Sequence, residues 1–113
     1  MRILETPVSL KELKKSADDS YGGLVKAVVD IGRGLIAVNA ELHSDLEALL
    51  TDSGSAREDL WGINLYPELP GDDFIEFDSM INLKPSQGNI TRGVEDTNIR
   101  RLISDQVNKW ITR

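Results

Sequence analysis

Two apolar segments separated by a short glycine-containing turn constrain the fold of this chain more than any other feature. Residues 24–30 and 35–38 are rich in valine, leucine and isoleucine, and residues 31–34 contain two glycines. This pattern predicts a β-hairpin. Because apolar residues occupy nearly every position of both strands, we expect both faces of the hairpin to be covered.

A second pair of strands is predicted over residues 60–66 and 74–83, where apolar and polar residues alternate. Alternation is typical of an antiparallel pair with one buried and one polar face. Pairing across the intervening loop would place Asn64 opposite Glu76 and Gly62 opposite Asp78. On this interpretation Glu76, Asp78 and Asn82 share the polar face.

Three amphipathic helices are predicted around these strands. Capping boxes begin helices at Ser9 and Ser44, which we expect to span residues 10–20 and 44–52, and the third helix begins after Asp96 or Thr97. Residues 1–4 add a short strand, so the element order is β-α-β-β-α-β-β-α. This order predicts one α+β domain over residues 1–113, with a mainly antiparallel sheet of four or five strands packed by three helices.

Composition excludes several classes of protein. The 113 residues contain no cysteine, which rules out disulfides, thiolate-bound metals and thiol nucleophiles. No apolar run approaches the roughly 18 residues of a membrane span, and no secretory signal is visible. The net charge of −6 disfavours nucleic-acid binding, which needs clustered lysine and arginine.

The charge is unevenly distributed along the chain. Residues 41–78 hold eleven acidic residues and one basic residue, whereas residues 84–113 hold six basic and three acidic residues. This division fits ordinary solvated surfaces. It also fits a site in which carboxylates lie beside an anion-accepting loop, and charge patterning alone does not choose between the two.

The polar, glycine-containing loop over residues 86–96 is the first candidate site. Glycines let backbone amides converge on an anion, and the loop leads into a helix N-terminus. The loop matches no known phosphate-binding motif. The alternative is a structural loop whose side chains bond its own backbone. The predicted ligand-binding residues are Ser86, Gln87, Asn89, Thr91 and Arg92.

The second candidate is a metal site formed by Glu76, Asp78 and His43, the only histidine. Two carboxylates on one strand face could hold a divalent cation or separate an acid from a base. With Arg92 stabilising an anionic oxygen, this set would suit a metal-assisted hydrolase or phosphoryl-transfer enzyme. The alternatives are a solvated sheet face for the two acids and a helix-start position for His43.

Several sequence blocks stand out: residues 28–30, 40–43, 58–67, 75–82, 85–89 and 92–96. Together they resemble a family of short prokaryotic proteins classed as a domain of unknown function. The resemblance implies a stand-alone cytoplasmic protein from a bacterium or archaeon, and it carries no activity, cofactor or site residue with it.

These observations favour a small cytoplasmic binding or interaction protein over an enzyme. Its ligand would be a small anionic molecule or a protein partner, bound by the loop over residues 86–96. Exposed hairpin edges and the long last helix also leave room for a homodimer. The metal-assisted enzyme and a purely structural role in a larger complex remain the competing hypotheses.

Overall fold

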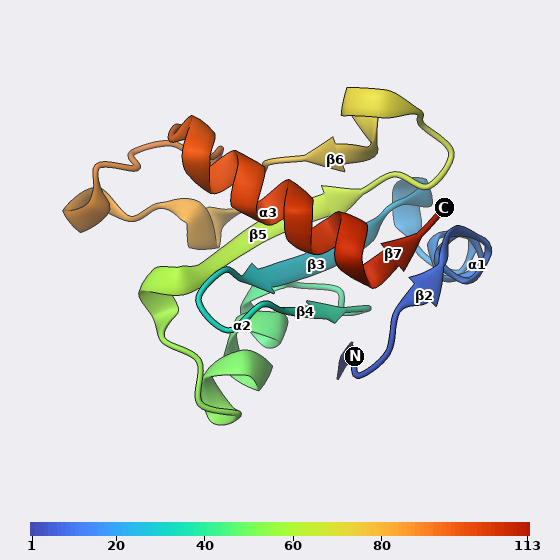
Figure 1. The fold of residues 1–113 in the computed structure, drawn as a ribbon, viewed down its shortest axis with the longest axis horizontal. Helices are drawn as coiled ribbons and strands as arrows, with labels where there is room; N and C mark the ends of the chain where they lie inside the picture. The colour runs from blue at the N-terminus through green and yellow to red at the C-terminus, as the bar shows by residue number, and fades with distance from the viewer.

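The fold combines a central antiparallel sheet with three helices (Figure 1). The computed structural model describes residues 1–113, except for the side chain of Tyr21. In chain order, the elements are β1 (Arg2–Ile3), β2 (Val8–Ser9), α1 (Leu10–Asp18), β3 (Val25–Asp30), β4 (Leu35–Val38), α2 (His43–Asp52), β5 (Leu60–Leu65), β6 (Ile75–Glu76), α3 (Thr97–Trp110) and β7 (Ile111–Thr112).

The main sheet has five strands in the order β1-β4-β3-β5-β6, and all neighbours are antiparallel. The predicted hairpin, β3 with β4, lies at its centre. A separate parallel pairing of β2 with β7 joins the two ends of the chain. The prediction of an α+β fold with an antiparallel sheet and three helices is therefore confirmed.

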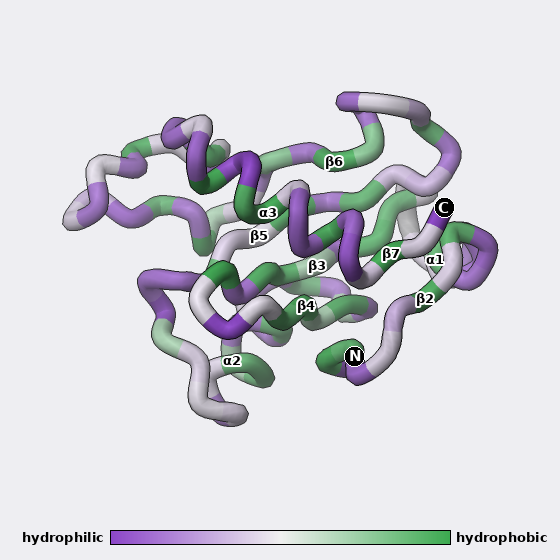
Figure 2. The backbone as a smooth tube through the Cα atoms, in the orientation of Figure 1, coloured by the Kyte–Doolittle hydropathy of each residue, from purple (hydrophilic) through white to green (hydrophobic). Residues whose placement is uncertain are grey.

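Helices cover both faces of the sheet, as the apolar hairpin predicts. On one face, α1 and α3 bury Leu13, Ile103 and Val107 in the larger core. On the other, α2 buries Leu46 and Leu50 in a smaller core. Figure 2 shows the most hydrophobic segments concentrated in the central strands. None of the helices in the described part of the chain has both the length and the apolarity needed to cross a bilayer.

The turn between β3 and β4 is organised by the buried carboxylate of Asp30. Its Oδ1 accepts hydrogen bonds from the amides of Gly32 and Arg33, both at 2.9 Å. Its Oδ2 accepts a hydrogen bond from the hydroxyl of Ser55. An aspartate that bonds the amides following it stabilises a turn locally. The bond to Ser55 additionally ties this turn to the segment after α2.

The predicted strand over residues 74–83 is mostly wrong, because only Ile75 and Glu76 form a strand. The register is as expected where the strand exists, because Asn64 lies opposite Glu76, but β6 ends there. The predicted polar face is found only in part: Glu76 is exposed, but every residue of β5 is buried, and Asn82 is fully buried instead of facing solvent. Residues Met80–Asn82 form a 3-10 turn that folds over the sheet.

Asn82 replaces the strand that the alternation predicts opposite Gly62. The Gly62 amide donates to Asn82 Oδ1 at 2.8 Å, and Asn82 Nδ2 donates to the Gly62 carbonyl at 2.9 Å. A side-chain amide carries the same donor and acceptor as a peptide group. The close approach requires glycine, since a Cβ at position 62 would lie 2.5 Å from the Cβ of Ser79.

Two predicted helix starts are confirmed and one is wrong. The Ser9 hydroxyl accepts from the amide of Glu12, and the Asp96 carboxylate caps α3. The predicted capping box at Ser44 does not form, because α2 begins one residue earlier, at His43, without a side-chain cap. This earlier start makes His43 part of the helix, from which its ring reaches the sheet.

Candidate functional site

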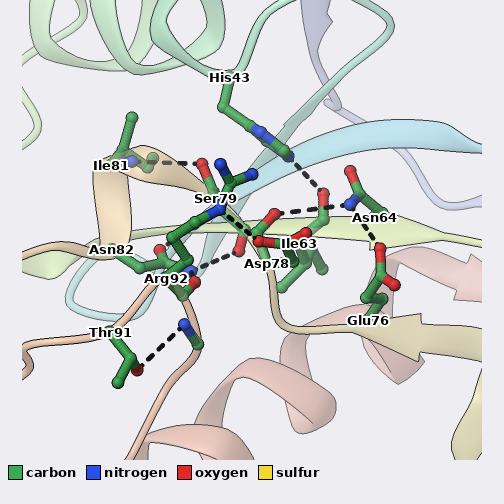
Figure 3. Close-up of polar contacts among 12 residues, drawn as sticks. His43, Ile63, Asn64, Glu76, Asp78, Ser79, Ile81, Asn82, Thr91 and Arg92 are labelled. Carbon is green, nitrogen blue, oxygen red and sulfur yellow. Dashed lines mark hydrogen bonds and ion pairs between the residues drawn. The ribbon is translucent and has the colours of Figure 1, made fainter.

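Six polar side chains gather where α2 approaches β5 and β6, and we refer to them as the polar cluster. They come from α2, from β5 and the residue after it, from β6 and the residues after it, and from the loop before α3. Figure 3 shows five of them around the middle of β5. The members are His43, Asn64, Tyr66, Glu76, Asp78 and Arg92.

Glu76 orders one side of the polar cluster. One of its oxygens accepts from Asn64 Nδ2 at 2.8 Å and from the Tyr66 hydroxyl at 3.1 Å. Desolvation, together with the hydrogen bond and negative charge of Glu76, raises the pKa of Tyr66 above its usual value. The phenol therefore stays protonated and acts as a donor at neutral pH.

The amide oxygen of Asn64 is a buried acceptor without a partner. The residue is only 7% exposed, and among the described residues no donor reaches its Oδ1. The bond from Nδ2 to Glu76 fixes which end of the amide is the oxygen. Figure 3 shows this oxygen turned away from Glu76. Buried polar atoms almost always have partners, so this unpartnered acceptor is an exception within the polar cluster.

Arg92 forms the other side of the polar cluster. Its Nε donates to Asp78 Oδ1 at 2.6 Å, while its side chain is 55% exposed. Its backbone is held as well, because the Arg92 carbonyl accepts from the Ser79 amide and from Asn82 Nδ2. Neither terminal guanidinium nitrogen bonds to the described residues. These two nitrogens form the fork that arginine uses to bind carboxylate and phosphate.

His43 is anchored to the sheet by one ring nitrogen. Its Nε2 lies 2.8 Å from the carbonyl oxygen of Ile63, which can only accept, so Nε2 carries the hydrogen. Burial lowers the pKa of His43 below its usual value, and the charges of Lys26 and Arg92 lower it further. The bond to Ile63 and the charge of Asp78 act in the opposite direction. The ring is thus neutral at pH 7, with Nδ1 as an acceptor.

The lowered pKa of His43 predicts a pH dependence of stability. The unfolded chain binds a proton at His43 below pH about 6.5, before the folded protein does. The free energy of unfolding should therefore fall as pH decreases from 6.5 towards the lower pKa of the folded state. NMR titration of the histidine ring, with urea unfolding between pH 7.5 and 5, measures both quantities. A ring that titrates above pH 6.5 would contradict the prediction.

The predicted metal ligands do not form a metal-binding group. The structure brings Glu76, Asp78 and His43 into one cluster, but each is engaged separately: with Asn64, with Arg92 and with the backbone. Among the described residues, no group of three or more histidine, aspartate or glutamate side chains is placed to hold a metal ion. The geometry thus gives no support to the metal-assisted enzyme.

The structure places the loop residues predicted to bind an anion in different surroundings, and two of them are engaged within the loop itself. The Asn89 side chain is buried and fully used, since Nδ2 donates to the carbonyls of Asn82, Thr91 and Gly93 while Oδ1 accepts from the Glu95 amide. The Thr91 hydroxyl accepts from the Gly93 amide.

Two more of these loop residues lie apart from the polar cluster. Gln87 bonds the carbonyl of Glu58, and Ser86 is exposed on the same 3-10 turn. Of the five predicted ligand residues, only Arg92 belongs to the polar cluster.

A cleft adjoins the polar cluster at Lys26. This lysine lies opposite Asn64 in the pairing of β3 with β5, and it lines a cleft of about 690 Å³ at the end of the sheet. Leu24, Ala40 and Leu42 supply apolar walls, and Asp19 also lines the cleft. Sequence reasoning did not identify Lys26 as a site residue. The sequence feature that could have identified it is the position of Lys26 as the one basic residue within the apolar segment of β3.

Comparison with known proteins identifies a family and nothing narrower. A family model described as a protein of unknown function, DUF5674, matches residues 2–110. No curated protein and no solved structure matches the chain. The match confirms the resemblance to an uncharacterised family.

Proposed function

The chain belongs to the DUF5674 family of proteins of unknown function, and we propose that it binds a small organic anion that also carries a hydrogen-bond donor. The carboxylate or phosphate of the ligand would pair with Arg92. Its donor, a hydroxyl or amine, would bond the amide oxygen of Asn64. The rest of the ligand would extend past Lys26 into the neighbouring cleft.

The unpaired fork of Arg92 carries this proposal. Asp78 holds the guanidinium through Nε, which orients the side chain and leaves both terminal nitrogens free. An arginine oriented in advance loses less conformational entropy when it binds an anion. The negative charge of Asp78 offsets the positive charge of Arg92. Lys26, which lies opposite Asn64, supplies a second positive charge.

The unpartnered oxygen of Asn64 narrows the class of ligand. A plain carboxylate leaves this acceptor unpaired, whereas a ligand that donates to it removes a cost of about 1–3 kcal/mol. A site with buried polar groups discriminates strongly against a ligand that lacks the matching group. We therefore expect hydroxy acids or amino acids to bind better than simple carboxylates.

The test compares glycolate with acetate, two probes that differ by one hydroxyl group. NMR titration at constant ionic strength should show tighter binding of glycolate, with shifts of the Asn64 side-chain amide. Arg92→Gln should weaken glycolate binding at least tenfold, because a charge-assisted bidentate pair is lost. The matched control is Arg57→Gln, an exposed arginine near the start of β5.

Two outcomes would refute the proposed function. One is equal affinity of the folded protein for glycolate and acetate. The other is an Arg92→Gln variant that keeps its native spectrum and still binds glycolate as wild type does. If Arg92→Gln loses its native spectrum, Asn64→Leu provides the second test. It removes the free amide oxygen while Arg92 is retained, and it should abolish the preference for glycolate.

A further inference from the structure

A polar groove, separate from the cleft at Lys26, lies on the opposite side of the sheet from the polar cluster. It has a volume of about 580 Å³ and runs between α3 and the segment that contains β6. Arg100, Ser104 and Asn108 line it from α3, and Phe77 lies on the β6 side. Residues four apart lie on one helix face, about 6 Å from each other along the axis. The α3 wall is thus an uninterrupted row of polar groups.

An arginine stands at each end of this groove, and each is held over an aromatic ring. The guanidinium of Arg100 lies 5.0 Å from the centre of the Phe77 ring, and that of Arg113 lies 4.2 Å from the Phe74 ring. Stacking on an aromatic face orients a guanidinium in its plane and leaves its edge available for hydrogen bonds. Both arginines are therefore positioned before any ligand arrives.

Neither arginine is neutralised within the described part of the chain. Arg100 donates through Nε to the Val94 carbonyl, and Arg113 donates through Nη2 to Asn108, but neither forms an ion pair with a carboxylate. Among the described residues, Asp72 is the one acidic side chain that lines the groove. Two arginines without a carboxylate partner thus line one groove of a protein with a net charge of −6, and they select for negative charge.

The spacing of the two arginines defines the shape of the ligand. Their aromatic supports, Phe74 at the end of a 3-10 turn and Phe77 just after β6, are three residues apart, a Cα separation of up to about 10 Å. One phosphate or carboxylate group is too small to reach both guanidiniums. Phe77 and Ile75 provide an apolar wall between them, which suits a hydrocarbon spacer.

From this geometry we infer a second binding site, for an elongated small molecule with an anionic group at each end. One terminal group pairs with Arg100 and the other with Arg113. The spacer lies against Phe77 and Ile75, while Ser104 and Asn108 bond polar atoms of the ligand. This site is independent of the polar cluster and of the function proposed for it.

The test is a length series of α,ω-dicarboxylates from succinate to suberate, with hexanoate as the monoanionic probe. NMR titrations at constant ionic strength follow the backbone amides of Ser104 and Asn108. Affinity should rise with length as the second carboxylate reaches the far arginine, and the best dicarboxylate should bind at least tenfold more tightly than hexanoate. Equal affinity across the series and for hexanoate would overturn the inference.

Variants place the binding in the groove. Arg100→Gln and Arg113→Gln should each reduce affinity for the best dicarboxylate to that of hexanoate. Arg101→Gln removes the same charge from an exposed position on α3 that does not line the groove, and should leave affinity within twofold. Arg92→Gln should also have no effect, which separates this site from the polar cluster.

If Arg100→Gln fails to fold, Ser104→Glu provides a second test of the groove. It keeps both arginines and places a negative charge at the middle of the groove, so dicarboxylate binding should be lost. If a folded Ser104→Glu variant binds the best dicarboxylate as tightly as wild type does, the groove is not the site.

Discussion

Replacing Asn82 with alanine is expected to lower the free energy of unfolding by about 3–5 kcal/mol. The substitution removes a buried amide that serves three backbone groups: the Gly62 amide, the Gly62 carbonyl and the Arg92 carbonyl. Each buried group left without a partner costs about 1–3 kcal/mol. Urea unfolding followed by circular dichroism measures the loss.

Asn98→Ala provides the matched control for Asn82→Ala. Asn98 is exposed in the first turn of α3, where only its backbone amide takes part in the cap. We expect its substitution to change stability by no more than about 0.5 kcal/mol. If both substitutions have the same small effect, the idea that Asn82 stands in for a missing strand is incorrect.

The consequence of Asn82→Ala should also reach the polar cluster. Asn82 holds the backbone of Arg92 directly, so its loss frees the loop that carries the guanidinium. Wherever the variant remains folded, glycolate affinity should fall even though no atom of Asn82 contacts the ligand. Unchanged affinity in the folded variant would show that the Ser79 bond alone positions Arg92.

Asp30→Ala is expected to destabilise the protein by about 3–4 kcal/mol. The substitution removes the acceptor for two turn amides and for the Ser55 hydroxyl, in a residue that is fully buried. Thermal and urea unfolding should both report the loss. Asp52→Ala, at an exposed position in the last turn of α2, is the control and should stay within about 0.5 kcal/mol of wild type.

Asp30→Asn distinguishes hydrogen bonding from charge. An asparagine keeps one oxygen for the Gly32 and Arg33 amides, and its NH2 can donate to Ser55, so the loss should be smaller than for alanine. Removing the Asp30 charge should also lower the pKa of Asp59, which desolvation and the charge of Asp30 raise. Equal destabilisation by alanine and asparagine would assign the role to the charge.

The candidate site shows where prediction from the sequence ends. Glu76, Asp78, His43 and Arg92 were identified from residue type and local position, and the structure places them in one cluster. Their proposed roles depended on partners that are distant in the chain. Asp78 has Arg92 as its partner, and His43 contacts the carbonyl of Ile63. No periodicity or spacing reports such contacts, so metal ligation was indistinguishable from separate hydrogen bonds.

Asn82 is the clearest failure of local reasoning. Alternation placed it on a solvated face, because an asparagine after apolar residues at strand spacing has the pattern of an exposed position. The strand ends early because Ser79 packs directly over Gly62 and the chain turns there. A buried asparagine that bonds backbone groups carries no distinctive local pattern.

Local patterns were enough to locate the three helices and the central hairpin, although not the start of α2, because apolar periodicity and the turn at Asp30 act between residues close together in the chain. The same patterns correctly predicted the antiparallel sheet and the pairing of Asn64 with Glu76. Packing alone determined the remaining features. These are the cleft at Lys26, the groove beside α3, the unpaired terminal nitrogens of Arg92, and the burial of Asn82 and Asn89. Each depends on hydrogen bonds or contacts between elements distant in the chain, and such partners form only when the whole core has closed around them.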